Sequence, residues 1–252
     1  MTALVLTYHA VEDGPPPLCI EPELFRAHVA VIEASGAVSL TVSELAAALR
    51  SGKLPGRTVS ITFDDGCASV VEQAAPVLRE HGMRATVFCV AGSLGAHNDW
   101  PTQAAWVPRL RLASAAALRE LADDGWELGS HGVEHSPLDT ADEEQAHHEV
   151  VDSRLLLEQQ VGVGISSFAW PYGVRPSAAA GAFIAATYGA ACGAGPGIVR
   201  QRDDVLALAR VDAHYLRSPA LLRWALKGSA GIYLTLRSTA SRVRRGLRPD
   251  HA

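Results

Sequence analysis

The sequence contains little that would cross-link the chain or carry it through a membrane. Only four of its 252 residues are cysteines, and no two of them form a C-x-x-C pair. This pattern argues against a disulfide framework or a cysteine-based zinc site. No apolar run reaches the roughly 18 residues that a transmembrane helix requires, and the apolar run at residues 1–8 lacks the preceding basic region of a signal peptide. We therefore expect a cytoplasmic protein with reduced thiols.

An excess of one charge sign is also missing. The 22 Lys and Arg residues against 27 Asp and Glu residues give a net charge of −5, which argues against a general nucleic-acid or anionic-membrane binder. We interpret the basic stretch 237–248 as the solvated face of a last helix, with an acidic partner as the alternative. Hydrophobic residues make up 48% of the chain, enough for a core. We expect one domain over residues 1–252, in which 218–252 form a C-terminal helical extension.

Short apolar runs alternate with helical stretches along the chain. Strands are expected at residues 3–8, 58–63, 85–90, 126–129, 166–170, 189–192 and 205–211. Helices are expected at 22–35, 41–51, 67–81, 114–124, 140–161 and 176–186, and in two segments between residues 219 and 246. Strands that alternate with helices at this spacing run parallel to one another. The sequence therefore predicts a single barrel-like α/β domain with its helices outside.

Polar residues follow several expected strands, which is where a barrel of this kind carries its chemistry. Asp64 and Asp65 follow one strand, and adjacent carboxylates repel unless a cation or a shared proton relieves them. His131 and His135 follow another, so two imidazoles four residues apart can face one ion. With a carboxylate they make a His₂-Asp set that leaves a coordination position open for water. The structural alternatives are a helix N-cap and a pair of loop histidines.

Residues 131–135 admit a second interpretation. They match H-x-x-E-H, which in some metalloproteases lies on a helix with the glutamate, here Glu134, as general base. Gly129 and Gly132 lie beside and within the segment, and Pro137 follows it. These residues disfavour a helix, so the protease interpretation is the weaker one.

The chain contains three short motifs at the ends of expected strands: Thr-Phe-Asp-Asp-Gly at 62–66, Ser-His-Gly-Val-Glu-His-Ser at 130–136 and Trp-Pro-Tyr-Gly at 170–173. These motifs resemble those of the polysaccharide deacetylase family, the NodB-homology domain of carbohydrate esterase family 4. The segment Thr-Tyr-His-Ala-Val at 7–11 is also similar to the start of many bacterial members. The order and spacing of the motifs agree with the family, and the resemblance covers most of the chain.

The resemblance implies a distorted, TIM-like (β/α)₇ barrel. It implies that Asp65, His131 and His135 hold one divalent metal ion, commonly zinc, with cobalt or nickel as alternatives. It also implies that Asp64 is the general base and that the backbone N–H of Tyr172 helps to form an oxyanion hole. Hydrolysis of an unactivated amide needs such a set, because a bound metal lowers the pKa of water from about 15.7 toward 7 and polarises the carbonyl. An ordinary turn is the alternative reading of the segment around Tyr172.

Two departures from the family pattern leave roles to be assigned. The third motif of the family carries an arginine two residues before its proline, and Ala169 stands at that position here. Arg210, on the expected strand 205–211, is our candidate to reach the same place, with a structural arginine as the alternative. The fifth motif, Leu-x-His, has no clear copy. His214 is therefore our candidate general acid, and His9 is the second choice.

The expected function is that of a metal-dependent hydrolase that removes an N-acetyl group from an amino sugar or a sugar-containing metabolite. In a cytoplasmic protein, the substrate would be small or carrier-linked, and nucleic acid is not expected as a partner. The alternatives are the same chemistry on a non-sugar amide or formamide, and an inactive carbohydrate-binding relative. The candidate substrate contacts are His9, Trp170, Pro171 and Tyr172, with Trp100 and Trp106 as further candidates for stacking on a sugar ring.

Overall fold

The computed structural model describes residues 1–193 and 195–228. The strands of its main sheet are β1 (Thr2–Tyr8), β4 (Val38–Ser39), β5 (Arg57–Phe63), β6 (Thr86–Cys89), β7 (Glu127–Ser130), β8 (Ser167–Ala169), β9 (Ala190–Cys192), β10 (Val199–Arg200) and β11 (Val211–Asp212). The α-helices are α1 (Pro22–Ala34), α2 (Val42–Arg50), α3 (Ala75–Glu80), α4 (Ala115–Asp123), α5 (Glu143–His147), α6 (Ser153–Val161), α7 (Ala178–Thr187) and α8 (Pro219–Leu226). Shorter elements are the pair β2 (Ala10–Val11) and β3 (Cys19–Ile20), and the turns η1 (Val70–Ala74), η2 (Ala91–Ser93), η3 (His148–Asp152), η4 (Pro171–Gly173) and η5 (Ala213–Leu216).

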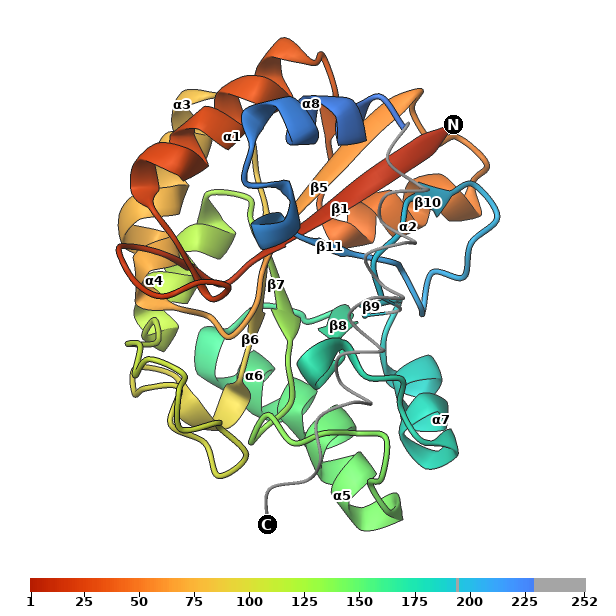
Figure 1. Ribbon diagram of the computed structural model, residues 1–252. Helices are drawn as coiled ribbons and strands as arrows, with labels where there is room; N and C mark the ends of the chain where they lie inside the picture. Colours follow the sequence, from red (N-terminus) through yellow and green to blue (C-terminus); the bar gives the residue numbers. More distant parts are fainter. Residues whose placement is uncertain (194, 229–252) are drawn as a thin grey trace, which may run out of the picture.

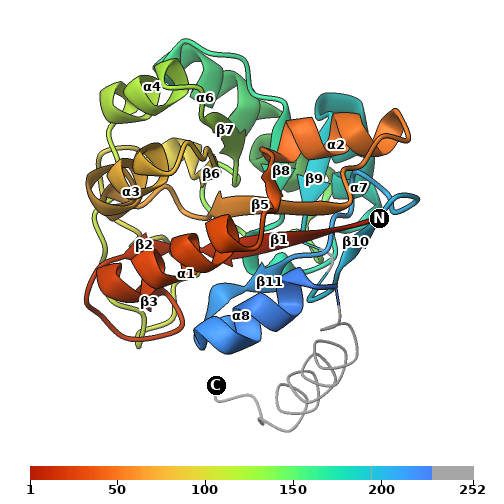
Figure 2. The same cartoon turned by 90° about the horizontal axis from the view of Figure 1, so that it is seen from above.

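The main sheet curls into a distorted barrel with the helices on its outside (Figures 1 and 2). Its strand order is β10-β1-β5-β6-β7-β8-β9, with β11 beside β1 and β4 beside β5. Neighbours run parallel except for β10, which pairs antiparallel with β1. The expectation of a TIM-like barrel is therefore confirmed. α8 packs beside α1 on the outer face (Figures 1 and 2).

The sequence of the central strand β1 is almost continuously apolar because both faces of this strand are buried. In β1 and β5 every residue after the first is buried, as in parallel strands that are covered on both faces. Alternate side chains of β1 point to opposite sides. Leu4 and Leu6 join the larger core cluster, which includes the outer helices, whereas Ala3 and Val5 join a second cluster with Phe88 and residues of α2. Both faces of β1 are therefore covered by apolar side chains.

The barrel closes through an irregular segment. We expected one continuous strand at residues 205–211, and this expectation is wrong. Leu208 makes an isolated parallel bridge to Cys192 of β9, and only Val211 and Asp212 form β11 beside the end of β1. The backbone N–H of Arg210 donates to the carbonyl of Gly195 at 3.2 Å instead of to a neighbouring strand. The ladder is therefore interrupted where Arg210 enters the barrel.

Two expected helices also differ from the sequence pattern. The helix expected at residues 140–161 is divided into α5, the π-helical turn η3 and α6. The helix expected at 67–81 starts with the π-helical turn η1 and continues as α3, which has Pro76 in its first turn, where a missing N–H is tolerated. Of the two expected C-terminal helices, α8 is present, and the second lies outside the described residues, as does the basic stretch 237–248. Within residues 1–193 and 195–228, no helix is both long and apolar enough to cross a membrane.

Candidate active site

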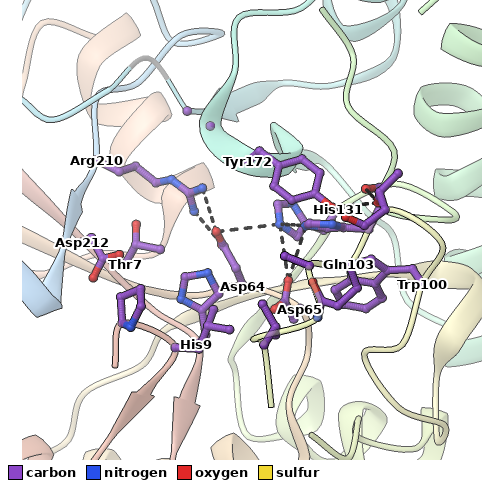
Figure 3. A pocket seen from close by; sticks show the side chains of 18 of the residues that line it. Thr7, His9, Asp64, Asp65, Trp100, Gln103, His131, Tyr172, Arg210 and Asp212 are labelled. Atoms are coloured by element: carbon purple, nitrogen blue, oxygen red, sulfur yellow. Dashed lines mark hydrogen bonds and ion pairs between the residues drawn. The ribbon is translucent and has the colours of Figure 1, made fainter. Parts of the chain in front are cut away.

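The carboxyl ends of the strands surround a pocket with a cavity volume of about 570 Å³. Each of several strands ends in a polar residue that lines it (Figure 3). β5 leads into Asp64 and Asp65, β7 into His131, and β8 into the turn that carries Tyr172. Residues that are more than 140 positions apart in the chain, such as Asp64 and Arg210, meet here. The expectation that strand ends carry the polar side chains agrees with this arrangement.

Asp65, His131 and His135 each offer one ligand atom, and these three atoms lie within 4.8 Å of one another. Figure 3 shows Asp65 and His131 side by side in the pocket. Nε2 of His131 lies 3.2 Å from Nε2 of His135. Oδ1 of Asp65 lies 3.7 Å from the first nitrogen and 3.6 Å from the second. Ligand atoms about 2.1 Å from a tetrahedral zinc ion are about 3.4 Å apart. The triangle therefore has the size of one face of such a coordination shell, and the three residues fit a divalent ion.

The histidine rings are held in this orientation by neighbouring groups. Nδ1 of His131 donates a hydrogen bond to the carbonyl of Ala169 at 2.9 Å, which leaves the lone pair on Nε2. The ring of His135 lies between those of Trp100 and Tyr172, with both centroids 4.5 Å away. Burial lowers the pKa of His135 well below its usual range. Both rings are therefore set to offer a nitrogen lone pair.

Asp64 is paired with Arg210. Two guanidinium nitrogens of Arg210 donate to the two carboxylate oxygens of Asp64 at 2.6 and 2.8 Å. Ala169, where the family carries an arginine, is fully buried in the second apolar cluster, with Ala3, Val5 and Phe88. Arg210 thus reaches from the closing segment of the barrel to the aspartate that the resemblance identifies as the base.

The two adjacent aspartates differ in their electrostatics. Burial acts to raise the pKa of Asp64, but attraction to Arg210, then to His131 and His9, outweighs it and holds that pKa well below the usual range. Burial raises the pKa of Asp65 despite the attraction of His9 and His131. Asp64 is therefore ionised across the neutral range, and a cation beside Asp65 would offset the cost of burying its charge.

The backbone is strained at the same place. Among the described residues, three non-glycine residues have a left-handed backbone, and all three line the pocket: Asp65 (φ 68°), His135 (φ 58°) and Tyr172 (φ 59°). Such conformations cost free energy and persist where the surrounding structure imposes them, often at functional sites. This observation marks the pocket as functional independently of any motif.

The structure separates the two candidate acids. His9 lines the pocket with Asp64 and Asp212, and Figure 3 shows it close to Asp64. His214 is not among the lining residues of this pocket. It lines a small second cavity, which His9 and Asp212 also line. The backbone N–H of His214 donates to the Asp212 carboxylate at 2.8 Å. The geometry favours His9, our second choice, over His214.

Only some of the expected substrate contacts line the pocket. Tyr172 and His9 line the pocket, but Trp170 and Pro171 are buried and do not line it. Trp170 packs against Gly193, where an added Cβ would come within 2.9 Å of the indole. These two residues shape the turn that presents Tyr172, so direct substrate contact by either is not supported.

The protease interpretation of residues 131–135 is wrong. The segment forms no helix in the described structure, because Gly132 has a φ of 91° and His135 one of 58°. The two histidines face each other across a loop. Glu134 does not line the pocket and cannot act there as a base.

Sequence reasoning gave no role to several residues that line the pocket. Thr102 and Gln103 belong to residues 94–112, a loop between η2 and α4. Thr102 donates to the carbonyl of His135 at 3.3 Å and lies 2.7 Å from the Tyr172 hydroxyl. This loop has no motif that could have revealed it. Asp212 directly follows the last expected strand, so its place at a strand end could be predicted, but its role could not.

Comparison with known proteins identifies relatives. The chain is 29% identical over 170 residues to YxkH of Bacillus subtilis, covering 67% of this chain and 56% of that protein. It is 25% identical over 198 residues to the poly-β-1,6-N-acetyl-D-glucosamine N-deacetylase of Staphylococcus epidermidis, covering 69% of this chain and 65% of the relative. The chain thus spans less than two thirds of the length of either relative.

Two solved structures share the fold. The Streptococcus pyogenes deacetylase PplD, in complex with acetate, superposes with a TM-score of 0.74 at 23% identity, covering 88% of this chain and 96% of that one. IcaB from Ammonifex degensii gives a TM-score of 0.75 at 22% identity, covering 88% and 97%. The family model for polysaccharide deacetylases matches residues 51–190, more than half of the chain. The chain therefore belongs to the polysaccharide deacetylase family.

Proposed function

We propose that this protein is a metal-dependent N-deacetylase that acts on an N-acetylated amino sugar. The observation that carries the proposal is the triangle of Asp65, His131 and His135, whose donor atoms are 3.2–3.7 Å apart, beside an ionised Asp64. The names of the relatives support it, since one of them is a poly-β-1,6-N-acetyl-D-glucosamine N-deacetylase. An inactive carbohydrate-binding relative would have no need for this arrangement of buried charges.

One part of the chemistry would come from a bound metal ion. A divalent ion held by Asp65, His131 and His135, with zinc as our first choice and cobalt or nickel as alternatives, would polarise the amide carbonyl and lower the pKa of water toward 7. The chain supplies the rest. Asp64 accepts the proton of the attacking water, and Arg210 keeps this carboxylate ionised and oriented. The backbone N–H of Tyr172 donates to the oxygen that becomes negative in the transition state.

Breaking the C–N bond requires a proton on the leaving amine. We assign this step to His9, because it lines the pocket together with Asp64, Asp65 and Asp212, whose carboxylates would attract the proton that a general acid must carry. Water adds to the carbonyl, the C–N bond breaks, and acetate and a free amine leave. His214 lies outside the pocket and would act only on the surroundings of Asp212.

The substrate itself is assigned only by class. The relative's name favours a polymer of N-acetylglucosamine. Trp106 supports a sugar substrate, since it lines the pocket, is 64% exposed and offers an indole face on which a sugar ring can stack. A small or carrier-linked acetamido sugar in the cytoplasm is the other substrate that we propose to test. A non-sugar amide is the second candidate class.

The test combines metal analysis with acetate release from a panel of N-acetyl sugars, from monomers to oligomers. Asp64→Asn should keep bound metal and lose acetate release, whereas Asp65→Asn should lose both. Asp13→Asn, at an exposed position, is the control that should change neither. Bound metal without acetate from any sugar would transfer the proposal to a non-sugar amide. A wild-type protein that binds no metal and releases no acetate would refute the proposal.

A further inference from the structure

Glu149 is a buried carboxylate that the mechanism above does not use. It is 1% exposed, lies on the π-helical turn η3 between α5 and α6, and does not line the pocket. Buried carboxylates are rare unless they have partners. The partners of Glu149 therefore indicate what it does.

Those partners lie in the loop that joins the two metal-binding histidines. Oε2 of Glu149 accepts a hydrogen bond from the backbone N–H of Val133 at 2.9 Å, and Oε1 accepts one from that of Glu134 at 3.2 Å. The Ser136 side chain also bonds to this carboxylate. The Glu149 side chain thus contacts Val133 and Glu134, which lie between the two histidines, and Ser136, which follows His135.

Gly132 lets the carboxylate come this close. A Cβ at position 132 would lie 2.3 Å from Oε2 of Glu149, and the φ of 91° at Gly132 is itself one that side chains rarely allow. The carboxylate and the loop therefore fit together only with glycine at this position.

The π-helical turn that carries Glu149 is itself held in place. The carbonyl of Val150 accepts hydrogen bonds from Oγ of Ser153 at 3.1 Å and from the Tyr188 hydroxyl at 2.8 Å. Oγ of Ser130, at the end of β7, donates to Oγ of Ser153 at 2.8 Å. Turns of this type inside α-helices frequently occur at functional sites. Here the turn is joined to the strand that ends immediately before His131.

We propose that Glu149 is a positioning residue that fixes loop 132–136, so that His131 and His135 face Asp65 before an ion arrives. The inference rests on the proposed function for its consequence, since a fixed set of ligands binds an ion without an ordering cost. The carbonyls of Gly132 and Val133 accept backbone N–H groups from Ala91 and Gly92 at 2.9 and 3.0 Å. The carboxylate of Glu149 serves the other side of the loop, where it accepts the N–H groups of Val133 and Glu134. Loss of a comparable outer partner typically weakens metal binding 10–100-fold.

The test measures metal affinity and backbone protection separately. Zinc affinity is measured by competition with a chromophoric chelator for the wild type, Glu149→Gln, Glu149→Asp and Glu127→Gln. In Glu149→Gln an amide NH₂ faces a backbone N–H. Glu127, at the opposite end of β7, is the matched control because it also accepts a backbone N–H, from Ser43 at 2.9 Å. Amide hydrogen exchange at Val133 and Glu134 is followed in metal-free protein.

We expect zinc affinity to fall 10–100-fold in Glu149→Gln and Glu149→Asp, with unchanged affinity in Glu127→Gln. We also expect faster exchange at Val133 and Glu134 in both Glu149 variants. Ser136→Ala is a milder change that removes one bond to the carboxylate, so it should weaken zinc binding several-fold. This variant replaces Glu149→Gln in the affinity measurement if Glu149→Gln does not fold.

Three results would overturn the inference. The first is unchanged zinc affinity in a folded Glu149→Gln, or in Ser136→Ala if the former does not fold. The second is full affinity in Glu149→Asp, which would assign the effect to charge alone. The third is unchanged exchange at Val133 and Glu134. A wild type that binds no zinc would instead refute the proposed function, and the exchange measurement in metal-free protein would still decide whether Glu149 orders the loop.

Discussion

Arg210 closes on Asp64 with two hydrogen bonds of 2.6 and 2.8 Å, although the two residues are 146 positions apart in the chain. The pair is buried, with Arg210 9% and Asp64 4% exposed. A bidentate guanidinium fixes both the charge and the direction of a carboxylate. An aspartate held in this way remains ionised, and its orientation toward the pocket is set before substrate binds.

Removal of Arg210 should change the pH dependence of the enzyme. Attraction to Arg210 holds the pKa of Asp64 below its usual range, whereas burial acts to raise it. In Arg210→Ala, burial still acts to raise the pKa of Asp64, but the guanidinium that lowers this pKa is gone. The pKa of Asp64 should therefore rise, and the acidic limb of kcat/KM should move to higher pH by about 1–3 units. Arg210→Lys should show a smaller shift.

The measurement is a pH–rate profile on the substrate found in the acetate panel. Arg202→Ala, at an exposed position in the same segment, is the matched control and should keep the wild-type profile. An unshifted acidic limb in a folded Arg210→Ala would show that another group determines it.

Metal binding should stabilise the fold. A ligand that binds only the native state adds about 2.7 kcal/mol at a concentration 100 times its Kd. Zinc added to chelator-treated protein should therefore raise Tm in the wild type and not in His131→Ala or His135→Ala. His147→Ala is the control, since His147 is an exposed histidine that pairs with Asp152 outside the pocket. A Tm increase of equal size in His131→Ala would place the ion elsewhere.

The two candidate acids can be separated by the alkaline limb of the profile. A general acid must be protonated, so activity falls as pH rises through its pKa. His9→Ala should lower kcat by about 10²–10⁴-fold and remove this limb, while His214→Ala should retain it. The opposite outcome would restore His214, our first sequence-based choice, as the acid.

Trp106 provides a test of substrate length. It lines the rim of the pocket and is 64% exposed, and an exposed indole offers a flat face to a sugar ring. Trp106→Ala should raise KM for N-acetylated oligomers several-fold and leave kcat and the KM of a monomer unchanged. Leu155→Ala, another exposed apolar residue that lies on α6, is the control. Equal effects on monomer and oligomer would exclude a second sugar position at Trp106.

The sequence predicted the barrel and the principal residues of the site because strand ends are readable. An apolar run such as β5, followed at once by Asp64 and Asp65, indicates both a buried strand and a polar group at its carboxyl end. His131 and His135 could be recognised in the same way, because they come directly after β7. The structure brings all of these residues to one pocket.

The rest depends on contacts that the chain makes at long range. Arg210 was a candidate only because Ala169 left a gap, and nothing near Arg210 in the sequence shows that it faces Asp64. The segment 205–211 read as a strand because it is apolar, yet the N–H of Arg210 bonds to Gly195 and breaks the ladder. His214 was preferred to His9 by its position near the end of the chain, which does not reveal the cavity it lines. The role of Glu149 depends on a π-helical turn that hydrophobic periodicity does not reveal.

The left-handed backbones of Asp65, His135 and Tyr172 have a consequence for engineering this protein. Glycine relieves such strain, so a screen that rewards heat tolerance alone would favour glycine at these positions. Each such change would remove a proposed metal ligand or a side chain that lines the pocket. Stabilising substitutions should therefore be sought in the outer helices, with these three residues kept unchanged. At these three positions, a substitution that stabilises the fold is expected to damage the pocket.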